Sequence, residues 1–186
     1  MTAARTPNYV AYDAFLRMEA ASDERHEWVN GVVYAMTRGT PEHSRLISRV
    51  LRALVLDEGC DTFASDTAIF IEAAQHHTYA DATVVCGPLV TRVVHDKNRK
   101  SMGEAIVNPA LIVEVLSDST QRYDRDGKFE AYKKLPSFRE CVLVSQDERR
   151  VEVRTRGETE WVTHVGTTGE TVSILGQPIA VDAIYG

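Results

Sequence analysis

Two acidic side chains interrupt apolar, strand-like stretches of the sequence, and they are the first candidates for chemistry. Residues 110–116 form an apolar run that only Glu114 breaks, with Pro109 before it and a Ser/Asp/Thr cluster after it. Such a run is typical of a buried strand. Asp81 interrupts a second β-favouring segment, residues 78–86. Because an ionised carboxylate removed from water needs a cation, a metal or a proton, the two acids indicate a site.

Three residues downstream could complete this site. Asp124, Lys128 and Tyr132 recur at i, i+4 and i+8, so a helix following the Glu114 strand would carry them on one face. Carboxylates bind hard divalent cations such as Mg²⁺, which acidify bound water and shield a phosphodiester, while a nearby ammonium stabilises the developing charge. The pattern therefore favours metal-assisted phosphodiester hydrolysis.

Each of these residues also has an ordinary structural interpretation. Glu114 could pair with a buried arginine, and Asp81 could be a solvated acid on an edge strand. Asp124 and Lys128 could form a surface pair that contributes ~0.3–0.5 kcal/mol. Tyr132 is expected to pack in the core with its hydroxyl bonded inward.

The elements that would position these residues can be predicted from apolar periodicity and turn signals. Thr40 and Pro41 form a helix start, and the apolar stripe behind them predicts a helix over 41–58 that ends at Gly59. The further expectations are a helix at 11–20, a strand at 28–36 with an Asn30-Gly31 turn or bulge, strands at 61–72 and 78–86 around a polar turn at 75–77, a poorly regular stretch at 88–108, and short strands after 138. We therefore expect one α/β domain over residues 1–186, with a sheet-rich C-terminal half.

Composition excludes several classes of protein. The formal net charge of −6 argues against wholesale coating of nucleic acid, although a local basic face stays open. Cys60, Cys86 and Cys141 are far apart and form no CxxC pair, so we expect buried thiols in a reducing cytoplasm rather than a disulfide or zinc site. The N-terminus lacks an apolar signal region, and no apolar run is long enough to span a membrane.

Several motifs together resemble the Uma-type putative restriction endonucleases, a branch of the PD-(D/E)XK nuclease superfamily. The match covers roughly residues 8–155. Its parts are Arg25-x-Glu27 with Asn30-Gly31, Met36, Pro41-x-His43, the segment with Asp81, NPALIVEVLSDST, Asp124-x3-Lys128-x3-Tyr132 and LVSQDERRVEV. The resemblance implies a restriction-endonuclease-like mixed sheet flanked by helices, with Asp81 and Glu114 holding Mg²⁺, for which Mn²⁺ could substitute.

Two positions depart from the pattern of this superfamily. Ala80 stands where a proline usually precedes the acid, which leaves the carboxylate of Asp81 in place. Leu116 stands where the superfamily usually carries its lysine, two residues after Glu114 on the same strand face. Lys128 is the natural substitute, because a helix packed back on the sheet could return its long side chain to the site.

Other candidate residues have weaker support. Glu27 could be an accessory acid or a surface residue, and His43 could border the site and contact phosphate or be a core or capping histidine. The residues best suited to contact nucleic-acid phosphates, unless their segment is only a solvated loop, are Arg92, Lys97, Arg99 and Lys100. His76 and His77 are expected in an exposed turn.

We therefore expect a cytoplasmic, Mg²⁺-dependent DNA endonuclease with Asp81 and Glu114 as metal ligands. Lys128 would orient water or stabilise the transition state, and Asp124 would position Lys128. A homodimer would suit the cutting of two antiparallel strands, although no residue demands it. The alternative is a catalytically inactive nuclease fold that acts as a nucleic-acid-binding or interaction module, which Leu116 and the acidic net charge would favour. A two-carboxylate glycosidase is disfavoured by the few aromatics available for sugar stacking.

Overall fold

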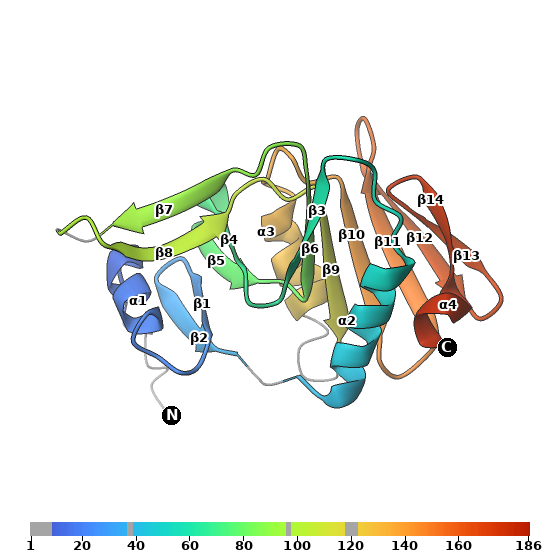
Figure 1. The fold of residues 1–186 in the computed structure, drawn as a ribbon, viewed down its shortest axis with the longest axis horizontal. Helices are drawn as coiled ribbons and strands as arrows, with labels where there is room; N and C mark the ends of the chain where they lie inside the picture. Colours follow the sequence, from blue (N-terminus) through green and yellow to red (C-terminus); the bar gives the residue numbers. More distant parts are fainter. Residues whose placement is uncertain (1–8, 37–38, 96–97, 118–122) are drawn as a thin grey trace, which may run out of the picture.

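The structure is a computed structural model that describes residues 9–36, 39–95, 98–117 and 123–186. Two six-stranded mixed sheets dominate it, and short helices pack between and around them (Figure 1). This mixed α+β architecture confirms the expected fold class. No helix among the described residues combines the length and apolar character needed to cross a bilayer.

The first sheet has the strand order β2-β1-β5-β4-β8-β7, and the second has the order β12-β11-β10-β9-β6-β3. The strands of the first sheet are β1 (His26–Val29), β2 (Val32–Ala35), β4 (Ala68–Ile71), β5 (His76–Tyr79), β7 (Thr91–His95) and β8 (Ser101–Ile106). Those of the second are β3 (Cys60–Ala64), β6 (Ala82–Cys86), β9 (Leu111–Leu116), β10 (Glu140–Ser145), β11 (Arg150–Arg156) and β12 (Trp161–Thr167). A separate hairpin joins β13 (Thr171–Ile174) to β14 (Gln177–Ala180).

The helical elements fill the space around these sheets. They are α1 (Tyr12–Glu19), α2 (Pro41–Ala53), a 3-10 turn (Glu72–Ala74), a π-helical turn (Tyr123–Lys128), α3 (Phe129–Tyr132) and α4 (Val181–Tyr185). The short α3 lies between the two sheets, where Phe129 and Tyr132 belong to one apolar cluster with Ile69 of the first sheet and Leu143 of the second (Figure 1). The residues just before α3 are thereby held where the two sheets meet.

The start of α2 follows the prediction, but its end does not. The Thr40 hydroxyl accepts a hydrogen bond from the His43 amide at 3.1 Å, and Pro41 is the first helical residue. The helix ends at Ala53 because Leu54 is extended and packs against the core of the second sheet. Gly59, with a φ of +85°, instead serves the turn into β3.

The segment from residue 60 to 86 contains four strands rather than the two expected. It leaves the second sheet after β3, forms β4 and β5 in the first sheet, and returns to the second sheet as β6. Asp81 therefore lies at the crossing between the sheets, and the prediction of one strand over residues 78–86 is wrong. Residues 88–108 were expected to be the least regular, yet they include the β7–β8 hairpin.

The expectation of an exposed turn at His76 and His77 is also wrong. The 3-10 turn at residues 72–74 and Gln75, which is left-handed with a φ of 48°, connect β4 to β5. His76 and His77 begin β5, where they are 2% and 3% exposed. His77 packs against the rings of Phe15 and Tyr79, so the pair is part of the first sheet rather than of the surface.

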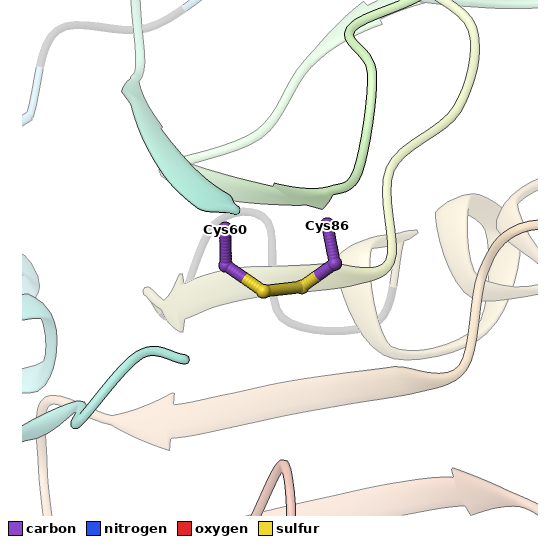
Figure 2. Close-up of a disulfide and its surroundings, with 2 residues drawn as sticks. All are labelled: Cys60 and Cys86. Atoms are coloured by element: carbon purple, nitrogen blue, oxygen red, sulfur yellow. A yellow bond between two sulfur atoms is a disulfide. The ribbon is translucent and has the colours of Figure 1, made fainter. Parts of the chain in front are cut away.

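A disulfide joins Cys60 to Cys86, contrary to the prediction that no disulfide would form (Figure 2). The two residues are paired partners in the antiparallel strands β3 and β6, with their Cα atoms 4.0 Å apart. Spacing along the chain could not reveal this pairing, because it depends on how the two strands align. Cys141 is free and buried, as expected, but the cysteines no longer support the argument for a reducing compartment.

We predict that the buried histidines make the fold sensitive to acid. Burial lowers the pKa of His77 to about 4, so between pH 6.5 and 4 the unfolded state binds more protons and stability falls as the pH falls. Over this pH range the free energy of unfolding of His77→Phe, measured in urea, should fall by about 3 kcal/mol less than that of wild type. The surface variant His164→Gln is the control, and a wild-type pH slope in His77→Phe would contradict the prediction.

Candidate active site

The site is organised around the buried ammonium group of Lys128. Its Nζ lies 3.0 Å from Oε1 of Glu27, 3.3 Å from Oδ1 of Asp124 and 3.5 Å from Oε1 of Glu114. It also donates a hydrogen bond to the carbonyl oxygen of Tyr79 at 3.1 Å. Lys128 is only 5% exposed, so the solvated surface pair considered for Asp124 and Lys128 is excluded.

Strand pairing brings Asp81 next to Glu114. Strands β6 and β9 are antiparallel, and the last registered pair beside the site is Ala82 with Val113. Asp81 and Glu114 come next along the two chains, and both line the same cavity, close enough for the charge of Asp81 to raise the pKa of Glu114. The Val115 amide donates to Oδ2 of Asp81 at 2.6 Å and holds the carboxylate at the strand end.

Glu27 reaches the site from the first sheet. It stands on β1 opposite Tyr34 of β2 and accepts a hydrogen bond from the Thr78 hydroxyl at 2.5 Å. Glu27 is 5% exposed, so the surface position considered for it is wrong. Acids from both sheets thus surround one lysine that enters from the helix between them.

The turn that carries Asp124 and Lys128 is π-helical over residues 123–128, a conformation often found at functional sites. Gly127 is required in this turn, because a Cβ atom there would lie 2.8 Å from the Tyr123 ring. Arg125 forms an ion pair with Glu152 at 2.5 Å, which ties the turn to β11. Residues 118–122, which include most of the Ser/Asp/Thr cluster after the Glu114 strand, lie outside the described residues.

Burial and mutual charge shift the pKa values within the site. Burial raises the pKa of Glu114 well above its usual value. The negative charges of Asp81 and Asp124 raise this pKa further, whereas the positive charge of Lys128 lowers it. Burial alone would lower the pKa of Lys128, but the carboxylates of Glu114, Glu27 and Asp124 raise it well above the usual value. The ammonium therefore stays charged, and an excess of acid surrounds it.

Tyr132 supports Glu114 from α3. Its hydroxyl donates to Oε1 of Glu114 at 2.6 Å, and the tyrosine is fully buried. This confirms the expectation that Tyr132 packs in the core with its hydroxyl bonded inward. Leu116, two residues after Glu114, is 3% exposed and packs in the same apolar cluster. The usual lysine position of the superfamily is thus used for packing.

His43 borders the site, and Gln146 orients it. Nε2 of His43 lies 2.8 Å from Oδ1 of Asp81, a hydrogen bond that raises the pKa of His43 against the effect of burial. The Gln146 amide nitrogen donates to the carbonyl of Leu116 at 3.0 Å and lies 3.3 Å from Nδ1 of His43. These contacts favour the tautomer in which Nε2 donates to Asp81. The sequence shows Gln146 only as part of the LVSQDERRVEV motif and does not single it out.

The acids, Lys128 and His43 all line a single cavity of about 850 Å³ that both sheets help to form. Of the basic residues proposed for nucleic-acid contact, the three that the structure describes do not line it. Arg92 pairs with Glu72 at 3.1 Å and stacks on Phe70, and Lys97 lies outside the described residues. Arg99 and Lys100 are exposed in the turn between β7 and β8, which projects away from α3 (Figure 1).

Comparison with known proteins identifies the family of this chain. The model of the Uma2 family, described as putative restriction endonuclease, matches residues 12–182. The chain belongs to the Uma2 family. The motifs from Arg25 to the LVSQDERRVEV segment therefore lie within the part of the chain that the family model matches.

Similar proteins and a similar structure accompany this assignment to Uma2. Uncharacterized protein slr1290 of Synechocystis sp. is 32% identical over 179 residues, which cover 93% of this chain and 90% of that protein. Uncharacterized protein sll1609 of the same organism is 28% identical over 152 residues, covering 80% and 82%. A crystal structure of a putative nuclease belonging to DUF820 from Anabaena variabilis superposes with a TM-score of 0.71 at 17% identity, covering 95% of this chain and 97% of that one. The likeness to that structure shows a shared fold.

We predict that Lys128 is essential to the stability of the fold without added metal. In Lys128→Met, three buried carboxylates lose their common cation, so the free energy of unfolding should fall by ~3–5 kcal/mol. Urea unfolding in EDTA measures this change. Lys133→Met, which removes a half-exposed lysine paired with Glu130, should change it by less than about 1 kcal/mol. A loss below about 1 kcal/mol in Lys128→Met would show that the site does not depend on this cation.

Proposed function

We propose that this Uma2 protein is a divalent-metal-dependent DNA endonuclease that hydrolyses phosphodiester bonds. The observation that carries the proposal is the position of the Lys128 ammonium, 3.5 Å from Glu114 in a cavity that Asp81 also lines. A family described as putative restriction endonucleases supports the same reaction class.

The donor set of the site fits Mg²⁺. Asp81 and Glu114 present hard oxygen ligands in one cavity, and Mg²⁺ is usually bound by one or two carboxylates together with water and substrate phosphate. Among the residues that the structure describes, no three His, Cys, Asp or Glu side chains form a ready-made metal cage, so water and substrate would supply the other ligands. When bound there, Mg²⁺, or Mn²⁺ in its place, would acidify water and shield the phosphodiester.

The side chains of the chain itself have separate roles in this proposal. Lys128 would stabilise the negative charge that develops on the phosphoryl oxygens, because its ammonium is preorganised and largely shielded from water. Asp124 and Glu27 would hold Lys128 charged and in place. His43 would orient Asp81 through its hydrogen bond and border the path of the phosphate.

The remaining expectations about partners extend this proposal. Arg99 and Lys100 would reach only a nucleic acid that continues beyond the cavity, whereas Arg92 is engaged in packing. A homodimer would place two sites on opposite strands, and a DNA substrate would place the protein in the cytoplasm.

Cleavage of supercoiled plasmid tests the proposed function. Wild type should nick the plasmid with Mg²⁺ or Mn²⁺ and be inactive in EDTA. Glu114→Gln should slow nicking at least about a hundredfold, since a carboxylate in direct contact with the metal is lost. Glu140→Gln alters another buried acid, on β10 and outside the cavity, and should remain active. If wild type with metal cuts no better than Glu114→Gln, the chain is better explained as an inactive nuclease fold with a binding role.

Metal binding can be measured without cleavage. A divalent ion that binds only the folded state raises the melting temperature, and here it would also relieve the repulsion between Asp81 and Glu114. Millimolar Mn²⁺ should raise the melting temperature of wild type and Glu140→Gln by several degrees, and Glu114→Gln should lose most of this increase. A wild-type melting curve that does not respond to Mn²⁺ or Mg²⁺ would remove the metal site from the proposal.

A further inference from the structure

We propose that the site acts on single-stranded nucleic acid, whose unpaired bases stack on Tyr34 and Tyr123 at the mouth of the cavity. This inference rests on the proposed nuclease function and specifies its substrate. Both tyrosines line the cavity, and neither was singled out as a site residue from the sequence.

Tyr34 stands directly beside the acidic site. It lies on β2 opposite Glu27 of β1, and directly opposite residues of an antiparallel pair project from the same face of the sheet. Glu27 contacts Lys128 at 3.0 Å, and both Tyr34 and Lys128 line the cavity. Tyr34 is nevertheless 52% exposed. A large aromatic side chain is thus exposed directly opposite one of the acids of the site.

Tyr123 flanks the same point from the π-helical turn. Its side chain is 39% exposed, and its ring centre lies 5.9 Å from Nζ of Lys128. Its hydroxyl lies 3.2 Å from Nε2 of His76, which restrains the ring while leaving part of it open. Proteins that bind single strands use such rings because every base can stack on an aromatic face, whatever the sequence.

The charges of the cavity favour a single strand over a duplex. Among the described lining residues, the exposed Asp23 and Glu24 add to the four buried or half-buried acids of the site, while Arg25, Lys128 and His43 are the basic side chains. A duplex carries two phosphate chains and relies on many lysine and arginine contacts for affinity. One strand brings half of this charge density.

Base availability leads to the same conclusion. In a duplex the bases stack on one another, and unstacking them costs free energy before a side chain can stack in their place. Bases of a single strand can be splayed and stacked on tyrosine directly. A strand whose bases rest on Tyr34 and Tyr123 would bring its phosphate toward Lys128 and the carboxylates that line the same cavity.

Binding to labelled oligonucleotides tests this inference by fluorescence anisotropy in EDTA, where no metal-dependent cleavage can occur. The probes are a 12-nucleotide single-stranded DNA, an RNA of the same sequence and a blunt DNA hairpin that contains the sequence as a duplex and is closed by a non-nucleotide linker, so that it has no unpaired bases. Wild type should bind at least one single strand about tenfold or more tightly than the hairpin. Tyr34→Ala should weaken single-strand binding at least about fivefold, while Tyr34→Phe should retain it because the ring is kept. Tyr9→Ala, which removes an exposed tyrosine outside the cavity, should bind as wild type.

The outcomes distinguish this inference from the proposed function. Hairpin binding as tight as single-strand binding, or full binding by Tyr34→Ala, would overturn the inference even if plasmid nicking succeeds. If no substrate is cut with Mn²⁺ but the single-strand preference depends on the Tyr34 ring, the proposed catalysis fails while the assigned ligand stands. Stronger binding of RNA or of DNA would identify which single strand the site takes.

Discussion

The structure depends on one electrostatic constraint, the burial of a lysine among carboxylates from three separate elements. Removing these charges from water is costly, and their attraction offsets the cost only while the groups remain in contact. Glu27, Glu114 and Asp124 must therefore meet at Lys128, which holds the first sheet, the second sheet and the intervening helix in one arrangement. The same contacts that stabilise the fold gather the groups to which we assign phosphodiester hydrolysis.

The position of Asp81 follows from the path of the chain between the sheets. The strands before and after it belong to different sheets, so the backbone bends there and frees the side chain from the alternation of a strand. Hydrogen bonds from the Val115 amide and from His43 then orient the carboxylate. The bend between β5 and β6 thus places the Asp81 carboxylate at the cavity.

The role that we propose for Lys128 depends on where its ammonium group lies and not on the element that carries it. Leu116 occupies the strand position and packs against α3, and this packing helps to hold the helix that returns Lys128. The ammonium reaches Glu114 from the helix side. For stabilising a transition state, the location of the nitrogen matters more than its origin in the chain.

The sequence alone determined much of the local structure and pointed to the acidic site. A carboxylate within an apolar run, such as Glu114, must be stabilised by a cation, a metal or a proton. Thr40, followed by Pro41, specifies a helix start through its capping hydroxyl. Only the tertiary structure decided which residues meet. The Cys60–Cys86 disulfide, the burial of His77 and the contact of Gln146 with His43 all arise from strand pairing and crossings between elements distant in sequence. Periodicity carries no information about such pairings, because it reports which face of an element is buried and not which partner covers it.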